Sequence, residues 1–397
     1  MASQGRLIAP DPQEKVDEPS PCSAKKGTVA IELQATGLFS RDAVAELITT
    51  GKRLLLAGDE RLLTGLPKGE WIGGTIPYFM APGGGVHTAD ALFVTELPPS
   101  EALTIKRYTV TELSGIAADH PGHGFTVLLL PAFTGIHQEF ANNVADYPGV
   151  FDRPLIGWIA GVALEDIGKV SPKVFDGLAG SSSDGDAVAM HVELNQDDTV
   201  AVNIINLFTP GNGDTISFEQ AAFSVHEALV NGEPANFARY LTDHGTDTRL
   251  PLVGDYSGAM INVSIRLVDA AAGKVDFYAP VFPGIDYYIA APVDDYVAGF
   301  NAQLHPDGPA PAFACNCILN YLYADLEGRS TPPIIGPMTF GEIAYMLLNQ
   351  TAVYLTTNRE ESAYMLSMNR YYSASSTARL DASAIISDAN AGSVELL

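Results

Sequence analysis

Residues 313–355 set polar side chains into an otherwise hydrophobic stretch, FACNCILNYLYADLEGRSTPPIIGPMTFGEIAYMLLNQTAVYL. Two cysteines, three asparagines and Glu342 lie in this apolar context. A buried polar group that finds no hydrogen-bond partner costs roughly 1–3 kcal/mol. These side chains are therefore expected to bond to one another or to a bound molecule, because a plain hydrophobic core would not need them.

The FACNCIL segment reads as a strand in which Cys315 and Cys317 share one face and Asn316 takes the other. A closed zinc site needs four ligands, and the nearest histidine is His305, so we predict no metal here. A nucleophilic thiol would need a neighbouring base or a helix N-terminus to lower its pKa. Two interpretations stay open: buried thiols acting as small apolar residues, and a cysteine-dependent enzyme.

A second polar group lies in MTFGEIAYMLLNQT, residues 338–351. Glu342 follows Thr-Phe-Gly, so it is expected at a turn or a helix start, where free backbone N–H groups favour a carboxylate. Asn349 and Gln350 are expected to begin a strand. Amide, hydroxyl and carboxylate groups together suit recognition of a small polar ligand, and a turn network that satisfies itself is the alternative. No residue is assigned a catalytic role, and the residues predicted to bind a ligand are Cys315, Asn316, Cys317, Thr339, Phe340, Gly341, Glu342, Asn349 and Gln350.

Other motifs that carry chemistry are incomplete. The segment GSSSDGD lacks the G-x-S-x-G spacing of a nucleophile elbow, and GGTIPYFMAPGGG lacks the Gly-Lys-Ser/Thr of a phosphate-binding loop. His120 and His123 lie in DHPGHGF, which reads as a turn. Any of the eight histidines could be an axial haem ligand, but a lone histidine is more often structural. We therefore predict no cofactor, with haem as the alternative.

Composition disfavours several partner classes. The 397 residues carry a formal net charge of −25 and only 22 lysines and arginines, so neither nucleic acid nor an anionic membrane is an expected partner. Three cysteines make no disulfide framework, which favours a reducing compartment. No apolar run reaches the roughly 18–20 residues of a membrane span, and the N-terminus lacks the apolar region of a signal peptide. We expect a cytoplasmic protein.

Hydrophobic patterning predicts the elements that must position these residues. Ser40 is a good N-cap for a helix that Gly51 ends. Strands and helices alternate over about 40–145, strand patterns dominate over 154–208, and the segment 218–245 reads as largely helical. We predict a mixed α/β (α+β) fold with two sheet-containing halves, flanking helices, and mixed or largely antiparallel sheets.

The segment IIGPMTFGEIAYMLLNQTAVYL resembles the C-terminal signature of FIST domains, in which a Gly-x-x-Thr-aromatic-Gly-Glu-Ile turn precedes an Asn-Gln-Thr strand. FACNCIL is similar to the Ser/Ala-Cys strand before that signature, and residues 155–177 and 181–194 are similar to the N-terminal half. The resemblance covers about 45–357. With the polar ends of the chain, it divides the sequence into a disordered tail (1–27), an N-terminal FIST-like half (28–210), a C-terminal FIST-like half (211–362) and a helical or flexible tail (363–397).

The resemblance implies a two-part sensor that binds a small molecule between its halves. FIST modules often sit beside an output domain, and this chain has no room for one, so we expect a stand-alone cytosolic module that signals through a separate protein. Three alternatives remain: a haem-binding gas sensor of the same family, a cysteine-dependent enzyme, and a structural protein that forms a homo-oligomer.

Overall fold

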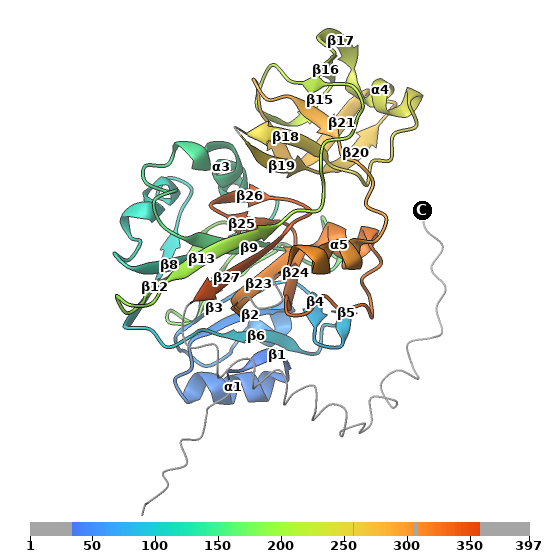
Figure 1. Ribbon diagram of the computed structural model, residues 1–397. Helices are drawn as coiled ribbons and strands as arrows, with labels where there is room; N and C mark the ends of the chain where they lie inside the picture. Colours follow the sequence, from blue (N-terminus) through green and yellow to red (C-terminus); the bar gives the residue numbers. More distant parts are fainter. Residues whose placement is uncertain (1–33, 257, 305–308, 358–397) are drawn as a thin grey trace, which may run out of the picture. The chain divides into compact units, whose positions relative to one another are not determined.

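The computed structural model describes residues 34–256, 258–304 and 309–357. The predicted tails, 1–27 and 363–397, lie outside the described residues. As predicted, the fold is mixed α/β: most described residues with regular structure belong to five sheets, mixed or antiparallel, with short helices between them (Figure 1).

The first sheet is mixed and carries two helices on one face. Its strands, in spatial order, are β1 (Thr36–Phe39), β6 (Leu92–Glu96), β2 (Leu54–Gly58), β3 (Trp71–Thr75), β10 (Val174–Asp176) and β11 (Ser181–Ser183). Helices α1 (Arg41–Thr49) and α2 (Glu60–Leu63) bury Val44, Ile48 and Leu63 in a small core with this sheet. The predicted cap is confirmed, because the Ser40 hydroxyl accepts the backbone N–H of Ala43 at 3.3 Å.

The second sheet is built around the parallel pair β8 and β9. In spatial order it contains β26 (Met346–Leu348), β25 (Glu342–Ala344), β9 (Leu155–Ala160), β8 (Gly124–Pro131), β12 (Ala187–Glu193) and β7 (Ala102–Tyr108). Helix α3 (Gly135–Asn143) contacts β8 and β26, and it lies within the segment 40–145 where strands and helices were expected to alternate.

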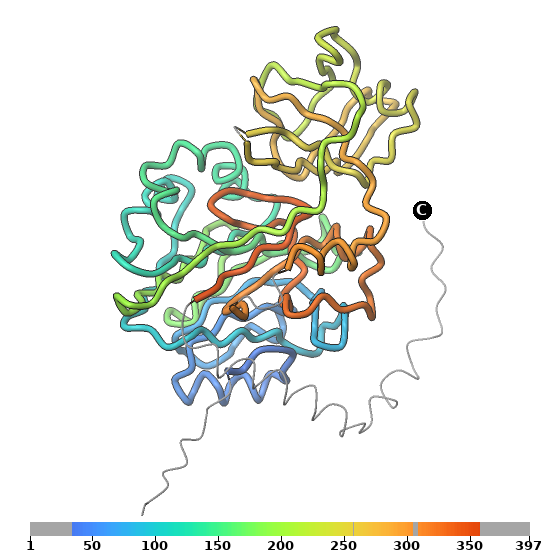
Figure 2. The backbone as a smooth tube through the Cα atoms, viewed as in Figure 1, coloured from blue at the N-terminus to red at the C-terminus, as the bar shows by residue number. Residues whose placement is uncertain are grey.

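The third sheet joins strands from both ends of the described chain. Its order is β13 (Val200–Ile205), β27 (Ala352–Thr357), β23 (Pro311–Cys317), β24 (Gly336–Thr339), β4 (Tyr78–Ala81) and β5 (Gly84–His87). β24 runs parallel to β23 and antiparallel to β4. Orange and red strands from the C-terminal part of the chain thus lie directly beside blue and green strands from the N-terminal part (Figures 1 and 2).

Aromatic contacts pack the third sheet against the first two. The Phe79 ring of β4 stacks on Phe93 of β6 with centroids 5.9 Å apart. The Phe313 ring of β23 stacks on Trp158 of β9 at 5.4 Å. These residues belong to the largest hydrophobic core, to which Cys315 and Cys317 also contribute.

A second core lies between the fourth and fifth sheets. The fourth contains β17 (Glu233–Asn236), β16 (Glu227–Val230), β14 (Ile216–Ser217), β22 (Tyr287–Ile289), β18 (Leu252–Tyr256) and β19 (Ala259–Val263), and the fifth β15 (Ala222–Val225), β21 (Lys274–Val281) and β20 (Ile265–Asp269). Phe218 makes edge contacts with Phe237 and Tyr287 in this core. The division of the chain near residue 210 stays a prediction.

The helix expected over 218–245 is largely wrong. That segment forms β15, β16 and β17, and only its end is helical, in α4 (Phe237–Asp243). Asn231 and Gly232, at φ 52° and 84°, make the turn between β16 and β17, because both can adopt the left-handed conformation of a tight hairpin. The turn chemistry therefore overrides the helical spacing of the apolar residues.

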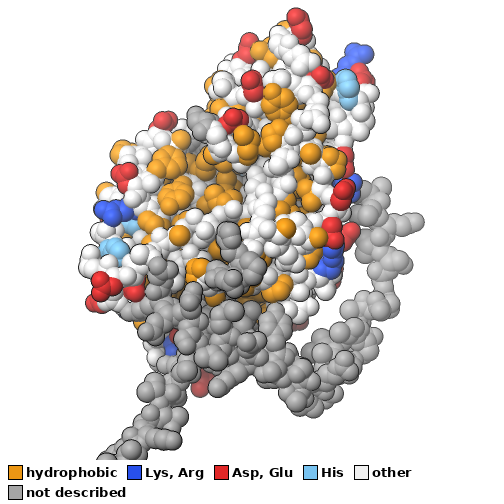
Figure 3. All heavy atoms as spheres, in the orientation of Figure 1, with side chains coloured by type: hydrophobic (Ala, Val, Ile, Leu, Met, Phe, Trp, Pro, Cys, Tyr) orange, Lys and Arg blue, Asp and Glu red, His pale blue; other side chains and the backbone are white. Residues whose placement is uncertain are grey.

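Two further helices reach the site described below, α5 (Tyr296–Gln303) and α6 (Ile318–Tyr323). Short 3-10 helices complete the elements: η1 (Leu113–Ala118), η2 (Val144–Asp146) and η3 (Leu164–Asp166). Within the described ranges, no helix is long and apolar enough to cross a membrane. Acidic side chains, red in Figure 3, are scattered over the visible face.

Candidate functional site

Strand pairing brings predicted residues from three strands together. In the parallel pair of β23 and β24, Cys317 lies beside Thr339. On the opposite side of β23, the backbone N–H of Cys317 donates to the carbonyl oxygen of Thr351 at 3.1 Å, just before β27 begins. The end of β23 therefore lies between two threonines that are distant in sequence.

Gly341 turns the chain from β24 into β25 where neighbouring side chains leave little room. A Cβ at this position would lie 2.9 Å from Leu347 Cδ1 and 3.1 Å from Ile159 Cγ1, so a larger residue would need a shift of its neighbours. Glu342 follows as the first residue of β25, so the expected turn is confirmed and the alternative of a helix start is wrong.

The carboxyl group of Glu342 is buried between the two threonines. Its Oε2 accepts the Thr351 hydroxyl at 2.9 Å and the Thr351 N–H at 3.3 Å, and its Oε1 lies 3.2 Å from Thr339 Oγ1. Burial raises the pKa of Glu342 to about 8, although hydrogen bonds from Thr351, Cys317 and Thr339 act in the opposite direction. The carboxyl group is therefore mainly protonated at neutral pH.

A proton on Oε1 of Glu342 completes this network. Thr339 Oγ1 lies 3.1 Å from the carbonyl oxygen of Gly341 and 3.3 Å from that of Asn316, and a carbonyl can only accept. The Thr339 hydroxyl can then donate to one of these carbonyls while it accepts the proton of Glu342. In this state the glutamate is a neutral hydrogen-bond donor within the core.

Both cysteines of the predicted site are buried thiols. Cys315 Sγ donates to the carbonyl oxygen of Gly157 at 3.5 Å. Burial raises the pKa of the Cys315 and Cys317 thiols well above its usual value, and Glu342 raises it further when its carboxyl group is ionised. A nucleophilic cysteine needs a lowered pKa and access to a substrate, so this environment favours the interpretation of the cysteines as structural residues.

Asn316 connects this buried network to the surface. Its Oδ1 accepts the backbone N–H of Cys317 at 2.7 Å and the Nδ2 of Asn320 at 2.9 Å. Its Nδ2 donates to the hydroxyl of Tyr296 at 3.3 Å. Asn320 lies on α6 and Tyr296 begins α5, and both line an open cleft.

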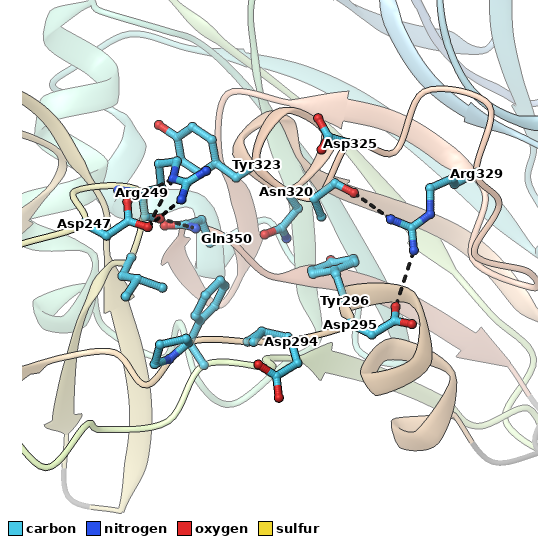
Figure 4. Close-up of a pocket in the computed structure, with 15 residues that line it drawn as sticks. Asp247, Arg249, Asp294, Asp295, Tyr296, Asn320, Tyr323, Asp325, Arg329 and Gln350 are labelled. Atoms are coloured by element: carbon cyan, nitrogen blue, oxygen red, sulfur yellow. Dashed lines mark hydrogen bonds and ion pairs between the residues drawn. The ribbon is translucent and has the colours of Figure 1, made fainter.

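The cleft has a volume of about 450 Å³, and distant parts of the chain contribute its walls (Figure 4). Aromatic rings of Phe208, Tyr296 and Tyr323 line it together with the amides of Asn320 and Gln350. Its charged residues are Asp247, Asp294, Asp295, Asp325, Arg249 and Arg329.

The two arginines of the cleft are already paired. Arg249 binds Asp247 through two parallel contacts, Nη2 to Oδ2 at 2.7 Å and Nε to Oδ1 at 2.9 Å. Arg329 donates to the carbonyl oxygen of Ala324 at 3.0 Å and to Asp295 Oδ1 at 3.4 Å. Figure 4 shows these two pairs at opposite ends of the cleft.

Gln350 is the one residue of the predicted set that lines the cleft. Its Oε1 accepts the hydroxyl of Ser264 at 2.7 Å, and its Nε2 donates to the carbonyl oxygen of Arg249 at 3.1 Å. The backbones of Gln350 and of Asp325, also in the cleft, are left-handed, each at φ 49°. Residues other than glycine rarely adopt this conformation, and it tends to occur at binding sites.

The remaining predicted residues lie apart from the cleft. The Phe340 ring packs edge-on against Phe133 with centroids 5.9 Å apart. The backbone carbonyl oxygen of Asn349 accepts a hydrogen bond from Asn262 Nδ2 at 3.1 Å. The side-chain Nδ2 of Asn349 donates to the carbonyl oxygen of Leu348. The structure thus brings Asn316, Cys317, Thr339 and Glu342 into one network, with Cys315 beside it.

Sequence reasoning missed most of the cleft. Tyr296 follows two aspartates that the sequence shows as DDY, and Asp295 caps α5 by accepting the N–H of Ala298 at 3.1 Å. Asn320 lies in the segment 313–355, whose polar side chains pointed to a site, but only its hydrogen bond to Asn316 connects it to the predicted residues. These residues meet through tertiary packing, which no local pattern signals.

Within the described ranges, no group of three or more His, Cys, Asp or Glu side chains is placed to hold a metal ion. Both ring nitrogens of His191 are occupied, by the hydroxyls of Tyr108 and Thr126 at 2.8 Å each. His137 is buried and its Nε2 has no hydrogen-bond partner among the described residues.

Comparison with known proteins gives a family. A family model described as a family of unknown function (DUF6976) matches residues 39–358. No curated protein matches the chain.

Proposed function

The chain belongs to this family, and from the geometry of the cleft we propose that it is a sensory module that binds a small polar molecule. The observation that carries the proposal is the continuity between the cleft and the core. Asn320 lines the cleft and bonds to Asn316, which in turn bonds to the backbone of Cys317. A ligand that bonds to Asn320 would therefore act on the network that joins β23, β24 and β27.

The sensory part of the proposal is supported by the resemblance of residues 334–355 to the FIST signature. The proposed module acts in the cytoplasm and passes its signal to a separate protein, and a homo-oligomer would present several clefts to that partner. The polar network that runs from Asn320 in the cleft to Glu342 in the core supports ligand binding more than catalysis. It contains a protonated carboxyl group and neutral thiols but no activated nucleophile.

Thermal-shift screening of small polar metabolites tests the proposal, with native mass spectrometry of the purified protein to detect a retained ligand. The variant Ala324→Trp places a large ring at the wall of the cleft, where Ala324 is a lining residue. Its matched control is Ala298→Trp, an exposed alanine of α5 that is not among the lining residues.

We expect at least one compound to raise the unfolding temperature of the native protein and of Ala298→Trp but not of Ala324→Trp, because bound ligand stabilises only the folded state. A screen in which no compound shifts the transition, together with a native mass that equals the bare chain, would overturn the proposal.

A further inference from the structure

We propose that the ligand of the cleft is a small organic cation, a primary amine or diamine, whose ammonium group bonds to Asn320 Oδ1 and to the carboxylates at the rim. This inference rests on the proposed function and names the chemical class of the ligand. Three observations carry it: the orientation of a buried amide, the charge of the lining residues, and the aromatic rings beside them.

The backbone fixes the orientation of the Asn320 amide. Asn316 Oδ1 must be an acceptor because the N–H of Cys317 donates to it at 2.7 Å. The Asn320 atom that lies 2.9 Å from the same oxygen must then be the donor Nδ2, which also faces the carbonyl oxygen of Thr351 at 3.4 Å. The other end of the amide is therefore Oδ1.

Asn320 Oδ1 is an acceptor that the protein leaves open. The residue is only 2% exposed, and it lines the cleft. Its Oδ1 accepts no hydrogen bond from any residue that the structure describes, and in Figure 4 its amide points into the space beside Tyr296. An acceptor that faces the cleft can accept a hydrogen bond from a ligand, and an ammonium group supplies up to three donors.

The lining charge favours a cation. Four aspartates and two arginines line the cleft, and both arginines are held by Asp247 and Asp295. Asp294 and Asp325 make no hydrogen bond or ion pair within the described ranges. The hydrogen bond to Asp247 and its charge raise the pKa of Arg249, and the charge of Asp325 adds a smaller contribution. Their carboxylates lie on opposite sides of the cleft in Figure 4.

The aromatic lining is compatible with the same class. A cation over the face of a tyrosine or phenylalanine ring is attracted by its negative π face. Tyr296 and Tyr323 flank Asn320 in the cleft, and Phe208 provides an apolar wall for a short carbon chain. An anion would meet two unpaired carboxylates and no unpaired guanidinium group.

Isothermal titration calorimetry with three four-carbon probes tests the ligand class. Putrescine, butane-1,4-diol and succinate have similar length but carry two positive charges, none and two negative charges. We expect putrescine to bind about tenfold or more tightly than the diol, since charged hydrogen bonds replace neutral ones, and succinate not to bind.

Variants locate the binding. Asp294→Asn and Asp325→Asn are exposed substitutions, and each is expected to weaken putrescine binding several-fold to about tenfold. The matched control is Asp286→Asn, which removes an exposed charge outside the cleft lining and should leave binding unchanged. Asn320→Leu, with folding checked by circular dichroism, should abolish binding.

Three outcomes overturn the inference. If succinate or the diol binds as tightly as putrescine, and Ala324→Trp weakens that binding, the ligand class is not a cation. The proposed function, binding of a small polar molecule in the cleft, is then left intact. Equal weakening by Asp286→Asn and Asp294→Asn shows attraction to the acidic surface in general rather than a site. Absence of binding by all three probes refutes the amine class, and the metabolite screen then decides separately on the proposed function.

Discussion

At the scale of single residues, Glu342 carries the sharpest consequence. Its pKa is raised to about 8 in the fold from an ordinary value of 4.5. Unfolding releases the proton at every pH between these values, so this group lowers stability as pH rises through that window and has no further effect above it. Below about pH 4.5 the group is protonated in both states, and its contribution is fully present.

The first prediction concerns Glu342→Gln. A glutamine amide copies the protonated carboxyl group, with its NH₂ toward Thr339 and its oxygen toward Thr351, but has no proton to lose. Relative to the native protein, the variant should gain about 1.4 kcal/mol in free energy of unfolding per pH unit between about pH 5 and about pH 8. Urea unfolding at several pH values measures this.

The exposed residue Glu219 supplies the control, because Glu219→Gln should leave the pH dependence of the native protein unchanged. Parallel stability curves for native protein and Glu342→Gln would show that Glu342 is ionised in the fold, and the protonated network would be wrong.

A second prediction concerns Cys315 and Cys317, each only 1% exposed. In a Cys22→Ser background, neither thiol should react with a thiol reagent at neutral pH until the protein unfolds, because only an accessible thiolate reacts. Both should react promptly in denaturant. Fast labelling of either thiol in the folded protein would contradict this prediction and support the alternative of a cysteine-dependent enzyme.

At the scale of elements, the central strand β9 allows no side chain at Gly157. A Cβ there would lie 1.8 Å from the carbonyl oxygen of Leu128 on the parallel neighbour β8. Backbone cannot move aside as a flexible side chain can. We therefore predict that Gly157→Ala lowers the free energy of unfolding by about 3 kcal/mol or more.

Gly115 makes the matched control for chemical unfolding of Gly157→Ala. A Cβ at Gly115 meets open space in η1, so Gly115→Ala should be neutral or slightly stabilising. Equal stability of the two alanine variants would contradict the packing at β9.

The sequence predicted local elements well where a cap or an apolar run defines them. Ser40 correctly predicted the start of α1. The Thr-Phe-Gly-Glu turn correctly predicted that Glu342 lies near Thr339, because the two residues are close in sequence. The helix expected over 218–245 failed because a two-residue turn at Asn231 outweighs apolar spacing. The cleft was missed because its walls meet only after distant segments pack together.

At the scale of the whole molecule, two buried histidines and one buried glutamate shift stability in opposite directions with pH, and together they set the pH of greatest stability. Burial lowers the pKa of His137 and His191 to about 4, so both stay neutral in the fold and stability is lost as pH falls from 6.5 towards 4. Glu342 acts in the other direction as pH rises towards 8.

The two histidines together outweigh the single glutamate between about pH 4.5 and 6.5, so we predict maximum stability between about pH 6 and 7. Thermal unfolding across pH measures it. In Glu342→Gln the decline on the alkaline side should disappear, and the rise in stability on the acid side should become steeper, because Glu342 no longer opposes the two histidines there. A native protein most stable near pH 5 would contradict the neutral state of the histidines.

The interleaving of strands has a consequence for biosynthesis. The ribosome releases β4 and β9 well before their neighbours β24 and β25, which arrive with residues 336–344. Until then, one edge of β9 presents unpaired backbone groups, and before residue 313 is made the Trp158 ring also lacks Phe313 to cover it. The nascent chain therefore emerges with open strand positions at its centre, and the network around Glu342 closes last, after translation of β27.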